Sequence, residues 1–593
     1  MKKTPRTQLR AAFVLVALCA LFVSAPAPLA AQGHLAVELG HPVYSVIETA
    51  ELRGVVTRLS SVKPYTSQQV SELLATMLGH MDAFSPAEQT MIRLYAQEFT
   101  AGKGVETSLW KDPKGTAEVG IRVEATTKLD AGGIYDLIEG SGSKSLKDMW
   151  NLTSLWVPHL QGEPLPWLSF RAELGYTLDK IEKSLYLPYE FTKQWDACHI
   201  PGYSDGTLDY PTASYDIAQD IAAETDNGAL MVRFSRFRRD WGIGSGSFSL
   251  SGTARPFVGI ETAFRPSRLL GISGLVGSLT NWEQGNNEKS TDPNALSFQK
   301  MFGIQRLEIF PTDWLSMAGT STIIGAKRFE LGYMAPLIYS TMYQNQLADI
   351  DNLGVQVDGQ LFVPRFGKVY GSFYADEMEI NDLFTQLFTK ARNMFAIQGG
   401  LKISLPKLTF ATLTAQYTKI EPFVYSHYAT WYPDYRLRVD TSYTQDGENL
   451  GYYLPPNSDE FLVRLDMTPA PGWRLGLKYS FVRHGDNPQA DWVAGLPEIF
   501  GNVNDYMDYG QLYSYNKSFL HDGIYDYNHI GSINIAWRPL NAPKLFGIEI
   551  PLELGAGYGL AYTWSIDGTG AGRPALVATG WKNVLSMSLK LFL

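Results

Sequence analysis

Four arginines, an aspartate and a tryptophan lie together in the segment 233–242, which has the sequence RFSRFRRDWG. Guanidinium groups bind carboxylates and phosphates through pairs of parallel hydrogen bonds, so this segment could hold an anionic ligand. The arginines could instead be neutralised by acidic side chains of other segments. We favour this structural role, because charged groups often form such networks without a ligand. The candidate residues are Arg233, Arg236, Arg238, Arg239, Asp240 and Trp241.

The residues just before this cluster alternate in polarity, which predicts the direction of the first arginine. Successive strand residues point to opposite faces, so Arg233 and Ser235 share one face. Later arginines fall on both faces, so we expect the strand to leave the apolar zone near Arg236. The residues 236–241 should then lie at the rim or fold inward through a glycine-rich turn at 242–246. The opposite, apolar face consists of Leu230, Val232 and Phe234.

A second charged pair is predicted in the segment 300–310, KMFGIQRLEIF. Arg306 and Glu308 are two residues apart, so they share one face of a strand. We expect acidic partners from other strands for Arg233 and Arg239, with Glu308 as the first candidate. These residues are interpreted as a polar network or a set of ligand contacts.

Aromatic residues are concentrated in the segment 425–435. Aromatic rings offer flat faces to sugar rings, so we list four of them as candidate glycan-stacking residues. Aromatic residues at the rim of a membrane barrel are also common without any ligand, and this alternative stays open. The candidates are Tyr425, Tyr428, Trp431 and Tyr432.

Evidence for catalysis is weak. The segment 202–206 reads GYSDG and matches the G-x-S-x-G pattern around Ser204, with Asp196 and His199 nearby. That pattern needs a strand, a turn and a helix, whereas prolines and glycines here predict an irregular loop. The nine histidines show no metal-ligand spacing. We therefore predict no enzyme activity, no metal and no cofactor.

The elements that position these residues are strands with a period of two. In the final segment, VLSMSLKLFL, Leu585, Met587 and Leu589 share one parity, while Ser586 and Lys590 share the other. Similar alternation recurs from about residue 110 onward. The clearest segments are 168–180, 354–363, 395–404, 461–467 and 473–483.

Composition and charge limit the class of protein. The 593 residues include 14 Trp, 32 Tyr and 29 Phe, and the formal net charge is −10, which disfavours nucleic acid as a partner. Residues 1–31 combine four basic residues, an apolar run and small residues ending in Ala30–Ala31, which predicts a secretory signal peptide. A single cysteine, Cys198, follows that peptide, so no internal disulfide is expected.

The segment 32–105 has a helical pattern instead. We predict three short amphipathic helices, beginning near Pro42, near Thr66 or Ser67, and at Ser85. The third has serine at the cap, proline next and Glu88 at the third helical position, which is a capping box. The segment could be a soluble periplasmic module or a plug under a barrel, and the sequence favours neither.

Together these patterns predict a mainly β fold, a transmembrane antiparallel β-barrel of about 16–18 strands over 106–593, with the small helical bundle before it. A barrel in lipid explains why each strand has an apolar face and a polar face. The expected location is the bacterial outer membrane, and the expected partners include its lipid and the barrel assembly machinery.

Several short motifs resemble the Wzi-type capsule assembly family. These are HPVY at 41–44, KPY at 63–65, RFRRDWG at 236–242, RLE at 306–308, FEL at 329–331, PL at 336–337 and QLADIDNLG at 346–354. The resemblance implies a barrel of about eighteen strands with a periplasmic helical element. It also implies a role in holding or assembling capsular polysaccharide at the cell surface, without enzyme activity.

The sequence leaves three candidate functions. The first is binding or assembly of surface or capsular polysaccharide, which the resemblance and the aromatic segment favour. The second is a porin or substrate-specific channel, which the polar strand faces favour. The third is an outer-membrane hydrolase built on Ser204, which the loop context disfavours.

Overall fold

The computed structural model describes most of the chain between Gly33 and Phe592. The signal peptide predicted over 1–31 lies outside the described residues. Further gaps are 102–106, 112–117, 137–148, 191–207, 226, 281–295, 298, 327, 329, 335–341, 345, 348–350, 379–382, 391, 428–429, 433–436, 486–516, 518, 521–523, 540–542, 546–547 and 569–574.

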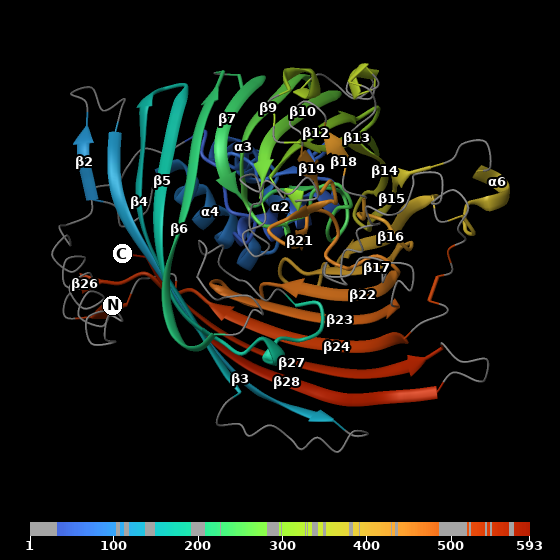
Figure 1. Ribbon diagram of the computed structural model, residues 1–593. Helices are drawn as coiled ribbons and strands as arrows, with labels where there is room; N and C mark the ends of the chain where they lie inside the picture. The colour runs from blue at the N-terminus through green and yellow to red at the C-terminus, as the bar shows by residue number, and fades with distance from the viewer. Residues whose placement is uncertain are drawn as a thin grey trace, which may run out of the picture.

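Eighteen antiparallel strands form a closed barrel, the upper value of the predicted range. The last strand pairs with the first, from Gly580 opposite Asp136 to Phe592 opposite Glu124, so the C-terminal strand closes the ring (Figure 1). A further strand, β2 (Thr107–Lys111), pairs with the start of β3. The wall strands are β3 (Glu118–Asp136), β4 (Trp150–Leu165), β5 (Leu168–Ile181), β6 (Leu208–Glu224), β7 (Leu230–Phe237), β9 (Phe257–Ser267), β10 (Leu270–Leu279), β12 (Lys300–Ile309), β13 (Leu315–Ala326), β14 (Asn352–Val363), β15 (Gly367–Glu377), β16 (Met394–Ser404), β17 (Thr412–Ile420), β22 (Ser458–Met467), β23 (Trp473–Gly485), β24 (Ile524–Trp537), β27 (Leu552–Asp567) and β28 (Ala575–Phe592).

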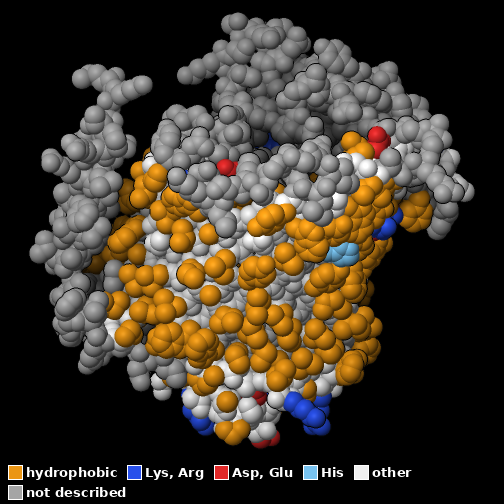
Figure 2. Space-filling model, turned by 90° about the horizontal axis from the view of Figure 1, so that it is seen from below, with side chains coloured by type: hydrophobic (Ala, Val, Ile, Leu, Met, Phe, Trp, Pro, Cys, Tyr) orange, Lys and Arg blue, Asp and Glu red, His pale blue; other side chains and the backbone are white. Residues whose placement is uncertain are grey.

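The outer face of the wall is apolar, as the alternation predicts. In β28, Leu585, Met587 and Leu589 are 47%, 57% and 38% exposed, whereas Val584 on the other parity is buried. Figure 2 shows hydrophobic side chains covering one side of the barrel, with Lys and Arg gathered mainly at one edge. An apolar surface of this extent would be unfavourable in water, so it is not expected on a soluble protein. Contact with membrane lipid accounts for it.

The two ends of the barrel differ in the length of their connections. At one end, here called the short-turn end, neighbouring strands are joined by brief segments such as 166–167, 225–229, 268–269, 310–314 and 364–366. At the other, the long-loop end, the connections 238–256 and 421–457 fold back into the lumen and contribute to one hydrophobic core. The long-loop half of the lumen is therefore packed with protein.

The inward-folded connections carry small strands of their own. These are β8 (Asp240–Trp241), β18 (Thr430–Tyr432), β19 (Leu437–Val439), β20 (Thr444–Gln445) and β21 (Glu448–Asn449), while β11 (Leu296–Ser297) joins β19 and β18 in a three-stranded sheet. The remaining short elements are β1 (Val62–Lys63), β25 (Lys544–Leu545), β26 (Ile548–Glu549), α6 (Leu383–Gln386), η1 (Met81–Ala83), η2 (Lys183–Leu185) and η3 (Leu331–Met334).

The three predicted N-terminal helices are present as α2 (Val43–Leu52), α3 (Ser67–Leu78) and α4 (Pro86–Ala101). In α3, the Thr66 hydroxyl accepts a hydrogen bond from the Gln69 amide, and the Gln69 side chain accepts one from the Thr66 amide, which closes a capping box. Ser85 and Glu88 make the same reciprocal pair at α4, so the predicted capping box is confirmed. None of the described helices is long and apolar enough to span a membrane.

The helices form a module with its own hydrophobic core, which Phe410 of the β16–β17 turn completes. Figure 1 shows α2, α3 and α4 enclosed by the wall strands. Polar contacts join the module to the lumenal wall: Glu51 pairs with Lys368 on β15 at 3.0 Å, and Glu48 pairs with Lys402 on β16. The module is thus docked inside the short-turn end, and charges account for much of its contact with the wall.

These ion pairs predict that docking weakens in acid. Burial alone would raise the pKa of Glu48, but Lys402 and other nearby lysines outweigh it and hold that pKa at about 2. The Glu98 pKa is also held at about 2, by His41 and Arg538 against the opposite effect of burial. A glutamate whose pKa is lowered on docking stabilises the docked state at pH values above its ordinary pKa of 4.5. This contribution should be lost as the pH falls from about 4.5 to about 2.

Amide hydrogen exchange of α2, corrected for the intrinsic effect of pH, measures this docking. Exchange should accelerate over that pH range in the wild type, and Glu48→Gln should reduce the pH dependence. Glu72→Gln, which changes an exposed glutamate of α3, is the matched control and should behave as the wild type does. Identical protection of α2 across the range would contradict the prediction.

Candidate functional site

The arginine-rich segment leaves the wall where the alternation predicts. Arg233 and Ser235 are buried in the lumen, while Leu230, Val232 and Phe234 on the other parity are exposed. Strand β7 ends at Phe237, and the chain then turns inward. Trp241 is fully buried and pairs through β8 with Val62 of the helical module.

Two acidic residues of neighbouring wall strands neutralise the buried arginines. Arg233 Nε lies 3.0 Å from Asp220 Oδ1 of β6, and its Nη2 donates to the His34 carbonyl at 2.9 Å. Arg239 Nε donates to Glu261 Oε2 of β9 at 3.1 Å. Glu261 Oε1 is also 3.8 Å from Arg233 Nη1, so one carboxylate serves both guanidiniums.

Glu308 is not the partner that was predicted for Arg233 or Arg239. Its carboxylate instead accepts hydrogen bonds from the Ser61 amide at 2.7 Å and from the Ser60 hydroxyl at 2.6 Å. The predicted pairing of Glu308 with Arg306 is present at 3.9 Å. The prediction failed because the helical module lies between β12 and the arginine segment and occupies this carboxylate.

The other two arginines of the segment also have oxygen partners. Arg236 Nη1 lies 2.9 Å from Asp216 Oδ1, and Arg238 Nη1 donates to the Thr253 carbonyl at 3.0 Å. Asp240 lies opposite Lys63 in the β1–β8 ladder, and burial raises its pKa to about 6, with Lys63 acting in the opposite direction. All four guanidiniums thus contact carboxylate or carbonyl oxygens.

The candidate glycan-stacking residues are separated by the structure. The Tyr425 ring is fully buried and stacks on Tyr443 at a centroid distance of 5.4 Å, with Tyr374 at 5.5 Å. Its faces are covered by protein, so the prediction that it stacks on a sugar is wrong. The backbones of Trp431 and Tyr432 lie in β18 at the long-loop end. Tyr428 lies outside the described residues.

The serine motif at 202–206, with Asp196 and His199, also lies outside the described residues. Within the part of the chain that the structure describes, no group of three His, Cys, Asp or Glu side chains is placed to hold a metal ion.

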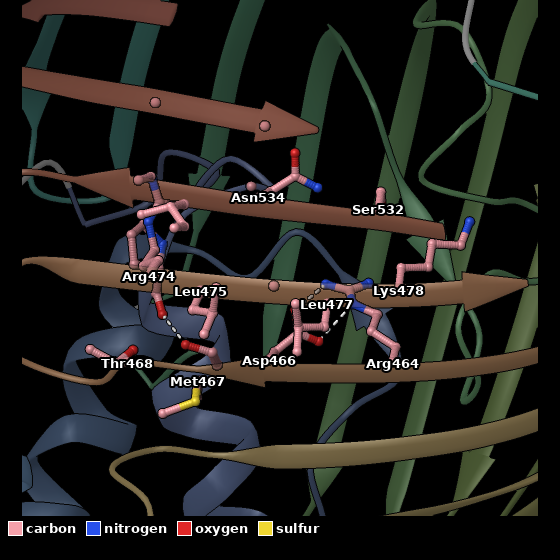
Figure 3. Close-up of a pocket in the computed structure, with 18 of the residues that line it drawn as sticks. Arg464, Asp466, Met467, Thr468, Arg474, Leu475, Leu477, Lys478, Ser532 and Asn534 are labelled. Carbon is pink, nitrogen blue, oxygen red and sulfur yellow. Dashed lines mark hydrogen bonds and ion pairs between the residues drawn. The ribbon is translucent and has the colours of Figure 1, made fainter. Parts of the chain in front are cut away.

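A polar cavity of about 610 Å³ lies between the helical module and the wall formed by β22, β23, β24, β27, β28 and β3. No local sequence pattern predicts this cavity. Figure 3 shows Arg464, Asp466, Arg474, Lys478, Ser532 and Asn534 around this space. Arg464 Nε lies 2.6 Å from Asp466 Oδ2, whereas Lys478 extends toward the Tyr453 ring, with its Nζ 5.3 Å from the centroid.

The wall of this cavity is built from cross-strand rows of small or polar residues. Lys478 lies opposite Ser532, and Gly476 lies opposite Asn534. The rows continue through Gly557 on β27 to Ser586 on β28. Small side chains on these strands leave room that larger ones would fill. The glycine, serine and asparagine residues of β23, β24, β27 and β28 that line the cavity are Gly476, Ser532, Asn534, Gly555, Gly557, Ser586 and Ser588.

No family model matches the chain, and no curated protein matches it. Among solved structures, Wzi of Escherichia coli, described as an outer membrane protein involved in group 1 capsule assembly and as a carbohydrate binding β-barrel, aligns with a TM-score of 0.51 and 11% identity. The alignment covers 94% of this chain and 99% of that one. The chain has the fold of the Wzi barrel.

Two Pseudomonas aeruginosa barrels align less well. OpdG has a TM-score of 0.40 and 12% identity, covering 80% of this chain and 98% of its own. OprD has a TM-score of 0.36 and 11% identity, covering 80% and 95%. A closed barrel with the Wzi fold and an apolar outer face is a protein of the bacterial outer membrane.

Proposed function

We propose that the chain binds surface or capsular polysaccharide at its long-loop end, which faces the cell exterior, with the helical module toward the periplasm. The observation that carries this proposal is the hydrophobic core inside the long-loop half of the lumen. An open diffusion channel needs a water-filled path, whereas this core makes the loops a rigid platform. The description of the Wzi barrel as carbohydrate binding supports the same function.

A buried lysine of the wall contacts the chain directly after β19. Lys300 of β12 donates to Asp440 Oδ2 at 2.9 Å and to the Thr444 hydroxyl at 3.1 Å. Asp440 directly follows β19, which pairs with β18, so this lysine anchors the strands that carry Trp431. Strands that are held in this way lose little conformational freedom when a ligand binds, and this favours affinity.

We expect Trp431→Ala to weaken binding of the native surface polysaccharide by about tenfold or more, because a central tryptophan commonly contributes over 1 kcal/mol. Binding is measured by pull-down with the purified protein and with polysaccharide from the source cells. Trp314→Ala is the matched control, since Trp314 is exposed in a turn at the opposite end. Unchanged affinity of the Trp431 variant, or unaltered surface polysaccharide in a deletion strain, would contradict the proposal.

The polar cavity favours a channel as the second candidate function, because a lumen with unfilled space could conduct. Planar-bilayer recording separates the two. The polysaccharide-binding proposal expects no stable single-channel steps from the wild type. Reproducible steps that a bulky substitution at Gly476 blocks would favour the channel instead.

A further inference from the structure

We propose that the lumenal cavity is a binding site for a small sugar acid, a molecule that carries one carboxylate and several hydroxyl groups. The site lies along β23, β24, β27 and β28. It contains none of the aromatic residues proposed above for surface polysaccharide, so it is a separate site.

The first observation is an ammonium group without a carboxylate partner. The other cavity cations on nearby strands are paired: Arg464 with Asp466 at 2.6 Å, Arg474 with Glu553, and Lys128 with Asp130 at 3.1 Å. Lys478 makes no ion pair with any residue that the structure describes, and its Nζ lies 5.3 Å from the centroid of the Tyr453 ring. A ligand carboxylate can therefore form a charge-assisted hydrogen bond there without displacing a protein acid.

The second observation is a polar floor beside this lysine. Ser532, Asn534, Ser586 and Ser588 line the cavity, and across the described ranges their side chains make no hydrogen bond to other protein side chains. Hydroxyl and amide groups both donate and accept, so each can bind the hydroxyl of a polyol. An isolated anion such as phosphate could accept hydrogen bonds from the lysine and the floor, but it offers few hydroxyl groups to donate in return, whereas a sugar acid both donates and accepts.

The third observation is the register that sets these groups side by side. Lys478 and Ser532 are cross-strand partners, and the next inward pair along the strands is Gly476 and Asn534. The glycine places no side chain over the floor, so a ring could lie across it beside Lys478, Ser532 and Asn534. The cavity volume of about 610 Å³ is within the usual range of about 300–1,000 Å³ for small-molecule sites.

The cavity wall also provides a way to block the site. A Cβ added at Gly476 would contact only Asp466 Oδ1, at 3.6 Å, so leucine there fits the wall and projects into the cavity. Gly531, on the adjacent strand β24, has no atom within 4 Å of an added Cβ and shares a row with exposed Tyr479 on the outer face. Gly531→Leu is therefore a matched substitution on the lipid side.

The test is calorimetric titration of the purified full-length protein in detergent with glucuronate, glucose and inorganic phosphate. Glucuronate should bind saturably, and glucose and phosphate at least about tenfold more weakly. Lys478→Gln should weaken glucuronate binding by about tenfold to a hundredfold, the usual effect of losing a hydrogen bond to a charged group. Gly476→Leu should abolish it. Gly531→Leu and Lys407→Gln, which changes an exposed lysine in the β16–β17 turn, should have no effect.

Absence of saturable glucuronate binding to the wild type would overturn the inference, as would full binding by the Gly476 variant. Equal binding of glucose and glucuronate would overturn the role of Lys478, and phosphate binding without glucuronate binding would overturn the role of the floor. Because the ligand is a free monosaccharide acid, failure here leaves the proposal for surface polysaccharide untouched. Loss of polysaccharide binding in the Trp431 variant is measured separately.

Discussion

Replacing Glu261 by glutamine is expected to lower the free energy of unfolding by about 3–5 kcal/mol, the usual cost of breaking a buried ion pair from one side. Glu261 lies within 3.1 Å of Arg239 and 3.8 Å of Arg233, and all three side chains are almost fully buried. The neutral glutamine amide no longer balances the charges of Arg233 and Arg239, so Asp220 is left as the nearby carboxylate for both buried guanidiniums. Urea titration of the folded barrel in detergent, followed by heat-modifiable gel mobility, measures the loss.

Asp313→Asn is the matched control. It removes one charge from the pair with Arg58 at 2.8 Å, but Asp313 is 65% exposed, so the cost should stay below about 1 kcal/mol. Similar losses in the two variants would show that the Glu261 cluster is more hydrated than the structure indicates. Glu261→Gln protein that still folds should retain polysaccharide normally.

Arg239→Gln separates the two interpretations of the arginine segment. The structural network predicts lower barrel stability and normal polysaccharide retention in the protein that folds. A ligand site predicts normal folding and lost retention. The contacts of Arg239 with Glu261, the Ser235 hydroxyl and the Phe237 carbonyl favour the first outcome, because they engage all three guanidinium nitrogens.

Local patterns predicted much of the fold. The parity of β7 and β28 follows from two-residue alternation, and the caps of α3 and α4 follow from residues three positions apart. Both patterns depend on neighbours along the chain, and both are present in the structure. The closing role of the last strand was predictable because a barrel in lipid leaves no strand edge unpaired.

Contacts between distant segments were not predictable in the same way. The partners of Arg233 and Arg239 depend on which strands are adjacent and on their register, so Glu308 was chosen without knowledge of the helical module that binds it. Tyr425 was predicted to stack on a sugar because aromatic residues are concentrated around it in the sequence, but its ring is buried against Tyr443 and Tyr374 in the lumen. The cavity wall depends on glycines and serines of β23, β24, β27 and β28 coming into one row, and only the register shows this.

The face assignment of β23 gives the second large effect. Leu477 is 37% exposed on the outer face, next to Leu465 and Ile533 in the ladder. Leu477→Arg should cost about 2–4 kcal/mol near the membrane midplane, because the guanidinium then faces hydrocarbon. Lys478→Gln, one residue later, changes a lumenal side chain that contacts the Tyr453 ring, so its cost should be about 1 kcal/mol or less.

Refolding of both variants into lipid vesicles, with urea titration of the folded fraction, compares the two costs directly. A large loss for Leu477→Arg and a small one for Lys478→Gln would locate the lipid on the Leu477 side. Equal losses would mean that the face of β23 is misassigned. The pair also bears on the cavity, because a Lys478→Gln barrel that folds normally shows that any loss of glucuronate binding in this variant comes from the site beside Ser532 and Asn534 and not from misfolding.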